Sequence, residues 1–486
     1  MSVNAHVDPS RLRREFSSRL SAMYAGEVPL YGQLIDVVRE VNREVIRARP
    51  ELGLRESDVL EISEERHGAI RLGREDEMTM MARFFAVLGM QPVNTYDLSA
   101  AGAKAQPVLS TAFRPVSLAE IEVSPFRVFC SLLRPDDERF FDDPRLRDRT
   151  KATLARREIF TPRLRELIAT FEEEGGLTRA EADTFLDEGL RLFGWSSRAT
   201  DRALYDELLA RQLTIAADIA CFPNPHLNHL TPNTLDIDAL QARMQRVLET
   251  DFPHLRAEMK DHIEGPPPRS VTVLLRQTSY KALTETVRFD GAIEGTHTAR
   301  FGEIEQRGVA LTPEGRRRYD DAVAEVETIR AEGREPTADE LATAFAALPD
   351  DLDGLRREGL GHFVYEVADH AAAARAAERG DDLEQLVAAG RVTARPIRYE
   401  DFLPVSAAGI FASNLRQAGA RNEGESPHSQ AELEAILERS VIDGPAHYAA
   451  QEARSLLAVH EELGLALAPG RRDELARIAA ATPEID

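Results

Sequence analysis

Few segments of this chain have the residue pattern of a β-strand, and this scarcity limits the folds that it can adopt. Most of its length instead carries apolar residues at helical spacing, as the first sixty residues do between Leu30 and Val45. The strand-like segments are residues 69–73, 270–275, 299–306 and 396–402. The sequence therefore predicts an α+β protein with a limited sheet and many helices.

Capping residues mark where several helices are expected to begin. Thr312 precedes Pro313, and proline is favourable in a first helical turn because an N–H there has no helical partner. Elsewhere a hydroxyl residue stands three positions before a glutamate, which is the pattern of a capping box. These pairs are Thr178 with Glu181, Thr337 with Glu340 and Ser429 with Glu432.

The net charge of −23 limits the partners that this chain can bind. Affinity for nucleic acids and anionic membranes comes from clustered Lys and Arg, but the chain has 60 of these residues against 83 Asp and Glu. We expect neither partner. No apolar run approaches the ~20 residues that span a bilayer, and the amino terminus lacks the apolar stretch of a secretory signal. A cytoplasmic location is expected.

Several common chemistries lack their sequence motifs. Cys130 and Cys221 stand in apolar surroundings and are too few for a disulfide framework. The phosphate-binding loop, the GxGxxG fingerprint, HExxH, CxxC and GxSxG are all absent. We therefore expect no nucleotide cofactor and no serine-hydrolase chemistry.

His67 and Arg71 are candidates for a shared site. They stand four residues apart, so their side chains lie on one face in either a strand or a helix. A metal ligand and a carboxylate-binding arginine could thus lie together. The alternative, an amphipathic strand edge with both side chains in solvent, is commoner for these residue types.

His226 and His229 are further candidates, three residues apart. Pro223, Pro225 and Pro232 crowd the segment and disfavour a helix. In an extended segment, residues three apart point to opposite sides. Both histidines therefore cannot bind one ion, and the spacing leaves open which of them does.

Glu303 and Glu305 are candidates for a carboxylate ligand. They are two residues apart in a strand-like segment, so both point to one face and either could reach a metal. A solvated strand edge with salt bridges is the commoner alternative. The remaining histidines that we considered are more typical of turns, core hydrogen bonds or solvent than of metal ligands: His297, His362 and His370.

Several long segments, in one order along the chain, resemble the 2-oxoadipate dioxygenase/decarboxylase family, which makes 2-hydroxyglutarate and belongs to the vicinal-oxygen-chelate group. They include RHGAIRLG, NHLTPN and RFGEIEQRG, which contain the candidates above, and also GMQPVNTYDL, STAFRPV, PFRVFCSLLRP and FLPVSAAGIF. The third segment is also similar to the FEIIQR-like strand of 4-hydroxyphenylpyruvate dioxygenases, whose first glutamate is a metal ligand. The resemblance spans roughly the whole chain.

The resemblance implies a site and a role for each residue in it. His67, His229 and Glu303 are expected to bind Fe(II), since two imidazoles and a carboxylate are the ligand set of non-haem iron oxygenases. His67 and His229 would thereby also contact the substrate. Arg71 is expected to be the catalytic residue that clamps the distal carboxylate, because a guanidinium makes two parallel hydrogen bonds to a carboxylate. Val405 is expected to contact substrate through its backbone.

The resemblance also implies the reaction. The substrate would be 2-oxoadipate, a 2-oxo dicarboxylate of lysine catabolism, and O₂ would be the other reactant. Loss of the C1 carboxylate as CO₂ and hydroxylation of the neighbouring carbon would give 2-hydroxyglutarate. Ser406, Arg114 and Arg307 are expected only as more distant polar contacts. An O₂-independent metal lyase or isomerase of the same fold group is the alternative. Oligomeric state has no sequence signal.

The implied fold is a vicinal-oxygen-chelate-like curved sheet of paired βαβββ-type modules around the metal, with extensive helical additions. We expect one catalytic unit over residues 1–486, with a helical layer at its start. The expected parts are the helical layer at 1–60, the metal-site sheet core with helical insertions at 61–310 and 390–415, and mainly helical parts at 311–389 and 416–486.

Overall fold

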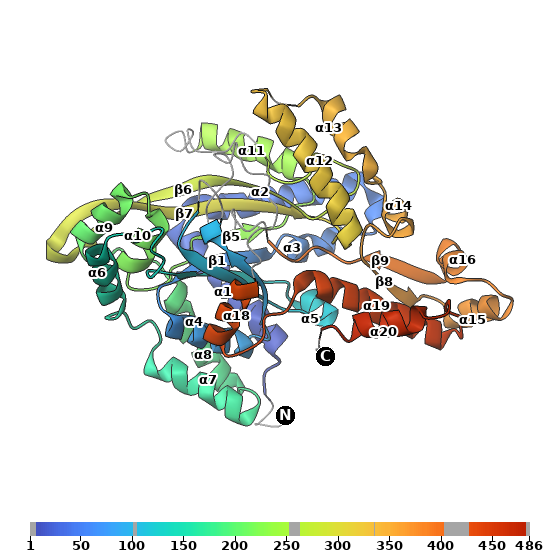
Figure 1. Ribbon diagram of the computed structural model, residues 1–486, viewed down its shortest axis with the longest axis horizontal. Coiled ribbons are helices and arrows are strands. Elements are labelled where there is room, and N and C mark those ends of the chain that lie inside the picture. Colours follow the sequence, from blue (N-terminus) through green and yellow to red (C-terminus); the bar gives the residue numbers. More distant parts are fainter. Residues whose placement is uncertain (1–5, 101–104, 252–262, 335, 403–426, 483–486) are drawn as a thin grey trace. The chain divides into compact units, whose positions relative to one another are not determined.

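The computed structural model describes residues 6–100, 105–251, 263–334, 336–402 and 427–482. The chain divides into two compact units, which both contain helices and strands (Figure 1). The first unit comprises Met1–Glu264, Gln277–Gln306 and Phe402–Val441, and the second comprises Gly265–Arg276, Arg307–Asp401 and Ile442–Asp486. The expected α+β class is confirmed. These boundaries differ from the expected ones, and a single catalytic unit over the whole chain stays a prediction.

The first unit contains a five-stranded sheet with the strand order β2-β3-β4-β1-β5. Four of its strands and two helices form a continuous run. The run is β1 (Glu65–Leu72), α4 (Glu75–Val87), β2 (Gln91–Asp97), β3 (Val108–Arg114), the short α5 (Leu118–Val123) and β4 (Arg127–Leu133). β1 and β4 are parallel neighbours, whereas β3 is antiparallel to both β2 and β4. A parallel pair needs a crossover connection, which α4, β2 and β3 supply.

A second run of elements repeats part of this arrangement. It consists of β5 (His229–Pro232), α11 (Ile237–Thr250), β6 (Leu275–Phe289) and β7 (Ile293–Arg307). β5 is antiparallel to β1, with Ala69 opposite His229. Just after β5, Asn233 pairs in parallel with Glu305, and the Thr234 N–H donates to the Glu305 carbonyl at 2.9 Å. β5 is therefore adjacent to both β1 and β7.

The two faces of the five-stranded sheet bury different side chains. Because side chains alternate along a strand, Ile70 and Leu72 join one core cluster while Ala69 joins another. The first cluster includes apolar residues of α1, α4 and α8, and the second includes those of α9 and α10. His67 and Arg71 share the alternation of Ala69, so they belong to the face that carries the second cluster.

Helices make up most of the rest of the first unit. They are α1 (Pro9–Glu27), α2 (Pro29–Ala48), α3 (Val59–Ile62), α6 (Pro144–Leu154), α7 (Pro162–Glu174), α8 (Arg179–Phe193), α9 (Arg202–Ala210), α10 (Thr214–Cys221) and α18 (Pro427–Leu437). The helices expected within the first sixty residues are thus present. No helix in the described ranges is long and apolar enough to cross a membrane.

The second unit has its own core and a small sheet. Its helices are α12 (Pro313–Ala331), α13 (Ala338–Ala344), α14 (Leu352–Arg357), α15 (His370–Glu378), α16 (Leu383–Ala388), α19 (Gly444–Glu462) and α20 (Arg471–Ala479). β8 (Phe363–Val367) and β9 (Val392–Pro396) form an antiparallel pair. A separate apolar cluster, which includes Val273, Phe345 and Leu360, forms the core of this unit.

Three of the four expected helix starts are confirmed. Thr178 and Thr337 each form a capping box, and the Thr312 side chain accepts a hydrogen bond from the Gly315 N–H. The fourth was wrong, because α18 already begins at Pro427 and the Ser429 hydroxyl donates to Asp97 instead.

Two of the expected strands need correction. Residues 270–275 are not a strand, because Leu274 adopts a left-handed backbone conformation with φ 54°, and β6 begins only at Leu275. Residues 397–402 do not continue β9, which ends at Pro396, where the ring nitrogen has no hydrogen to donate to a ladder. In this stretch Arg398 makes one isolated bridge to Val309.

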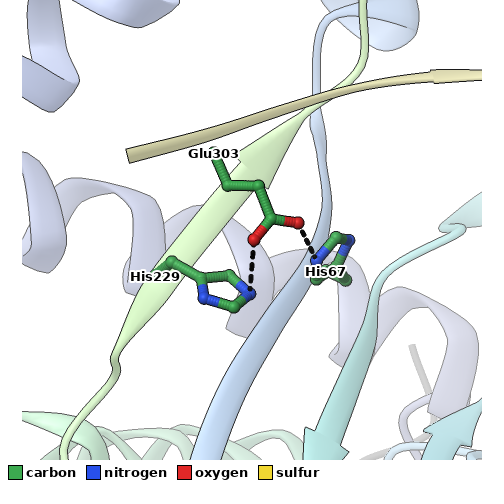
Figure 2. Close-up of side chains that lie close together, drawn as sticks. All are labelled: His67, His229 and Glu303. Carbon is green, nitrogen blue, oxygen red and sulfur yellow. Dashed lines mark ion pairs between the residues drawn. The ribbon is translucent and has the colours of Figure 1, made fainter. Parts of the chain in front are cut away.

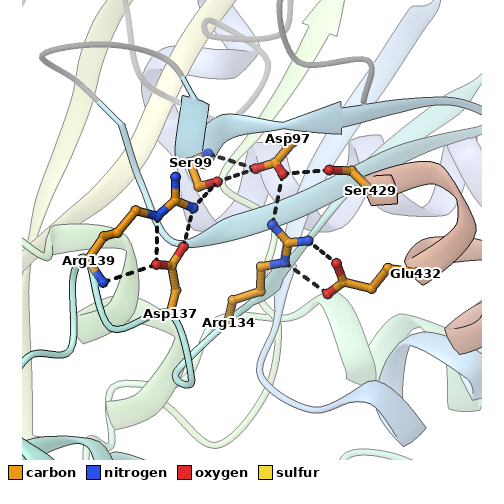
Figure 3. A network of polar contacts seen from close by, with 7 residues as sticks. All are labelled: Asp97, Ser99, Arg134, Asp137, Arg139, Ser429 and Glu432. Carbon is orange, nitrogen blue, oxygen red and sulfur yellow. Dashed lines mark hydrogen bonds and ion pairs between the residues drawn. The ribbon is translucent and has the colours of Figure 1, made fainter. Parts of the chain in front are cut away.

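A polar network anchors α18 to the end of the five-stranded sheet (Figure 3). Asp97, at the end of β2, accepts hydrogen bonds from Ser99, from Ser429 of α18 at 2.8 Å and from Arg134 Nη1 at 2.9 Å. Arg134 also pairs with Glu432 of α18. Burial raises the pKa of Asp97, but its hydrogen bonds to Ser99 and Ser429 and the charge of Arg134 outweigh burial and hold the pKa below its usual value.

We expect Asp97→Asn to lower the free energy of unfolding by about 2 kcal/mol at pH 7, because hydrogen bonds to a charged group are lost. Since folding lowers the pKa of Asp97, its contribution is fully present above the unfolded pKa and is lost as the pH falls through the folded value. The difference between wild type and variant should therefore shrink below about pH 4. Urea unfolding across this pH range measures it.

Asp136→Asn is the matched control, because this carboxylate pairs with Lys151 at the surface. It should change the free energy of unfolding by less than about 1 kcal/mol. Equal losses in the two variants, or a difference independent of pH, would contradict the assignment.

Candidate metal and substrate site

Three side chains from three adjacent strands meet in the first unit (Figure 2). They are His67 of β1, His229 of β5 and Glu303 of β7, and all three are fully buried. Glu303 Oε1 lies 3.0 Å from His67 Nε2, and Oε2 lies 3.5 Å from His229 Nε2. The carboxylate thus stands between two imidazoles. One possible ligand atom from each residue lies within 4.8 Å of the other two.

The strand pairing explains why these residues meet although they are far apart in sequence. β5 pairs with β1 on one side and is followed by the bridge to β7, so a residue from each strand can face the same point. Gly68, on the opposite face of β1 from His67, packs against leucines, since a Cβ there would lie 3.0 Å from the Leu227 side chain and 3.3 Å from that of Leu230.

The polar atoms of this cluster suit a metal ion. Within the described residues, both ring nitrogens of His229 and Oε2 of Glu303 are buried without a hydrogen bond. Buried polar atoms normally have a partner, because an unsatisfied one costs roughly 1–3 kcal/mol. A cation bound by the two imidazoles and the carboxylate would satisfy one nitrogen of His229 and the Glu303 oxygen, so the residues present fit a metal ligand set.

The charges around the cluster favour a neutral His229. Burial lowers the pKa of His229 well below its usual value, and the positive charges of His67 and Arg71 lower it further. A neutral imidazole is the form that binds a metal. Burial also raises the pKa of Glu303, although the neighbouring His67 opposes this shift.

Glu305 lies on the other side of His67. Its Oε2 is 2.9 Å from His67 Nδ1, whereas Glu303 faces Nε2 of the same ring. Burial lowers the pKa of His67, but the carboxylates of Glu305 and Glu303 outweigh burial and raise it. Both glutamates point to one face of β7, as their spacing predicts, yet they contact different nitrogens of one imidazole.

Arg71 lies in a position that the sequence only partly predicted. It is buried, and its positive charge is a lesser cause, after burial and the charge of His67, of the lowered pKa of His229. Its Nη1, however, lies 2.6 Å from Oδ2 of Asp218, a residue that the sequence analysis missed. The available signal was a lone carboxylate in the otherwise apolar helix α10. An isolated charge in such a helix needs a partner when it is buried.

His226 belongs to a different cluster from His229. Its Nε2 lies 3.3 Å from Asp218 Oδ1, and His297 Nε2 lies 2.9 Å from the same oxygen. The two histidines thus belong to separate clusters, and the expectation that they point to opposite sides stays a prediction. His297, expected in a turn, instead lies within strand β7.

The other candidates lie elsewhere. His362 is buried with Nδ1 2.8 Å from Glu452, and His370 is exposed. Arg114 Nη1 donates to the Pro115 carbonyl at 3.3 Å, and Arg307 Nη1 donates to the Asp401 carbonyl at 2.7 Å. Burial raises the pKa of both cysteine thiols, that of Cys221 to about 12, which disfavours thiolate chemistry. Val405 and Ser406 lie outside the described residues.

We expect protein loaded with Fe(II) in the absence of air to retain about one ion per chain after desalting, and His229→Ala to lose it, since three ligands become two. His362→Gln is the matched control, because it changes another buried histidine that is bonded to a single glutamate. Its metal content should equal that of wild type. Metal analysis of the desalted proteins decides this, and equal metal in all three would contradict the ligand assignment.

Comparisons with known proteins identify the family of this chain. The family described as 2-oxoadipate dioxygenase/decarboxylase matches residues 16–414. A 2-oxoadipate dioxygenase/decarboxylase of Pseudomonas putida is 46% identical over 476 residues, which cover 96% of this chain and 99% of the relative. The enzyme of that name from Escherichia coli is 44% identical over 457 residues, which cover 92% and 98% of the two chains.

Among solved structures, the hydroxyglutarate synthase of Pseudomonas putida in complex with 2-oxoadipate superposes with a TM-score of 0.81 at 45% identity. The match covers 95% of this chain and all of the other. A structure of the same synthase described without a ligand gives a TM-score of 0.78 at 42% identity, covering 95% and 100% of the two chains. The family match, the close relatives and the shared fold together show that this chain belongs to the 2-oxoadipate dioxygenase/decarboxylase family.

Proposed function

We propose that this protein converts 2-oxoadipate and O₂ to 2-hydroxyglutarate and CO₂, with Fe(II) as its metal. The observation that carries this proposal is the buried group of two imidazoles and one carboxylate with an arginine nearby. Relatives over nearly the whole chain bear the name of this activity, and a similar structure holds 2-oxoadipate. The reaction balances, since one O₂ supplies the two oxygen atoms that the products gain.

His67, His229 and Glu303 would hold the iron, which supplies the redox chemistry by which a 2-oxo acid reacts with O₂. The three residues carry one negative charge when His67 and His229 are neutral, so they suit a divalent cation. Because their side chains are fully buried, bulk water is kept from this part of the site.

Glu305 would orient His67. With a proton on Nδ1, the imidazole donates to Glu305 Oε2 and directs its Nε2 lone pair toward the point that Glu303 also faces. Carboxylates commonly fix the tautomer and the ring orientation of a metal-binding histidine in this way. The neighbouring glutamates would therefore have separate tasks, one as ligand and one as the partner of a ligand.

The strand order supports a vicinal-oxygen-chelate-like fold. Apart from the short helix α5, the run from β1 to β4 has the order of a βαβββ module, and the run from β5 to β7 repeats its strand, helix and strand sequence. In the first run the last strand, β4, is parallel to the first strand, β1. In the second run, Glu305 of the last strand, β7, forms a parallel bridge with Asn233, the residue that follows β5. The candidate histidines occupy the first strand of each run, which places two related positions at one site.

Arg71 would bind the distal carboxylate of the substrate. The Arg71 guanidinium has five N–H groups, so it can donate to Asp218 and to a substrate carboxylate at the same time. The charge of Arg71 also offsets the net negative charge of the chain near the site. From the family resemblance, we further propose a backbone contact to substrate at Val405. The oxidation of a small soluble acid suits the expected cytoplasmic location.

We expect Arg71→Lys to lower kcat/KM for 2-oxoadipate by about tenfold or more, mainly through KM, because lysine keeps the charge but loses the planar pair of donors. Arg163→Lys, at a surface arginine paired with Glu166, should leave both constants unchanged. Steady-state kinetics with 2-oxoadipate measures the effect. An unchanged KM in Arg71→Lys would contradict the proposed clamp.

The overall reaction can be tested by its stoichiometry. Protein loaded anaerobically with Fe(II) and given 2-oxoadipate should consume O₂ on exposure to air, with equal amounts of O₂ consumed, CO₂ released and 2-hydroxyglutarate formed. His229→Ala should show none of the three changes.

Turnover of 2-oxoadipate without O₂ uptake would contradict the proposed function. That result would instead favour a metal lyase or isomerase. Replacing Fe(II) by Zn²⁺ provides a further control, since Zn²⁺ does not change its oxidation state and cannot support the reaction with O₂.

A further inference from the structure

A second buried polar cluster adjoins the candidate site through Arg71. Asp218 of α10 is its centre, and its two oxygens have different partners. Oδ2 lies 2.6 Å from Arg71 Nη1, whereas Oδ1 lies 2.9 Å from His297 Nε2 and 3.3 Å from His226 Nε2. Arg71 comes from β1, Asp218 from α10, His226 from the segment before β5, and His297 from β7. All four are buried.

The surroundings of this cluster hold its members in place. The Tyr205 hydroxyl lies 2.9 Å from His297 Nδ1, so both nitrogens of that ring have a polar neighbour. Trp195 stacks nearly parallel to the His297 ring with centroids 6.1 Å apart, and the Phe222 ring lies 4.4 Å from it. Asn228 Nδ2 approaches Asp218 Oδ2 at 3.5 Å. Aromatic rings thus restrict the imidazole that contacts Asp218.

The arrangement could be taken for a second metal site, since possible ligand atoms of Asp218, His226 and His297 lie within 4.8 Å of one another. The guanidinium of Arg71 argues against this assignment. It is always charged and already lies 2.6 Å from the same carboxylate, so a metal cation there would be repelled. A carboxylate held between one guanidinium and two imidazoles is better explained as the anchor of Arg71.

The ionisation of Asp218 is consistent with this role. Burial raises the pKa of a carboxyl group, but the charges of His226 and Arg71 and the hydrogen bonds from His226 and His297 hold the pKa of Asp218 well below its usual value. Asp218 is therefore an anion near neutral pH. A flexible arginine side chain that pairs with a fixed anion has fewer conformations open to it.

We propose that Asp218 is a positioning residue that fixes the Arg71 guanidinium and thereby sets the length of dicarboxylate that the enzyme accepts. This inference rests on the proposed function, in which one end of the substrate lies at His67, His229 and Glu303 and the other at Arg71. With both ends fixed, a diacid one carbon shorter or longer cannot satisfy both contacts. His226 and His297 keep Asp218 oriented from its far side.

The test compares wild type with Asp218→Asn, Arg71→Met and the double variant, using 2-oxoglutarate, 2-oxoadipate and 2-oxopimelate as substrates. Asp218→Asn should raise KM for 2-oxoadipate by about tenfold, with a smaller effect on kcat, and should reduce the preference for it over the other two acids. In the Arg71→Met background the same change should have no further effect, because Asp218 acts through Arg71.

The double variant also guards against misfolding, because it removes both charges of the pair and leaves neither buried alone. His297→Gln is a milder change that keeps the carboxylate, and it should shift KM in the same direction by a smaller factor. Calorimetry of 2-oxoadipate binding to the Fe(II) proteins in the absence of air measures the substrate affinity without turnover. The affinity should fall in parallel with the rise in KM.

Three results would overturn the proposal. One is an unchanged substrate preference in Asp218→Asn, which would leave Asp218 a purely structural role. Another is an equal loss from Asp218→Asn in the wild-type and Arg71→Met backgrounds. The third is the loss of a second bound metal ion from Asp218→Asn, which would make the cluster a metal site. Failure of wild type itself to turn over 2-oxoadipate would instead refute the proposed function, and the inference with it.

Discussion

The rest of the site depends on the contacts of the Glu303 carboxylate with two buried imidazoles. These contacts require β5 to pair with β1 on one side and to lead into the bridge with β7 on the other. A buried carboxylate without compensation is costly, and here burial raises its pKa. The bridge between Asn233 and Glu305 brings β7 close enough to β5 for the side chains to meet.

Two further carboxylates support the residues that would act on the substrate. Glu305 contacts the nitrogen of His67 that faces away from Glu303, and Asp218 contacts the guanidinium of Arg71. Each carboxylate fixes the orientation of the imidazole or guanidinium that it contacts, because solvent screens buried polar contacts little. In a chain of net charge −23, Arg71 and a bound divalent cation would supply the positive charge that an anionic substrate needs at this site.

Local patterns predicted much of the fold. Thr178, Thr337 and Thr312 cap helices as expected, because a cap depends on residues a few positions apart. The pattern at 270–275 failed because β-branched residues favour a strand but cannot reveal the left-handed turn at Leu274. Ser429 failed because its partner, Asp97, is distant in the sequence. Long-range contacts of this kind leave no local pattern.

In the candidate site too, local spacing predicted some features, and long-range contacts determined the others. His226 and His229 belong to separate clusters, but only family resemblance could choose between them as a ligand. Spacing also placed Glu303 and Glu305 on one face, although their different contacts with His67 depend on how β7 lies beside β1. Asp218 was missed because its partners come from β1, β7 and the segment before β5. The assignment of His67, His229 and Glu303 as ligands therefore needs a direct test.

That test is a crystal structure of the Fe(II) protein with 2-oxoadipate, prepared without air. We predict iron bound by His67 Nε2, His229 and Glu303, with Glu305 still at His67 Nδ1 and the distal carboxylate of the substrate on Arg71. Iron bound instead by Glu305, or by Asp218 with His226 and His297, would contradict this account of the site.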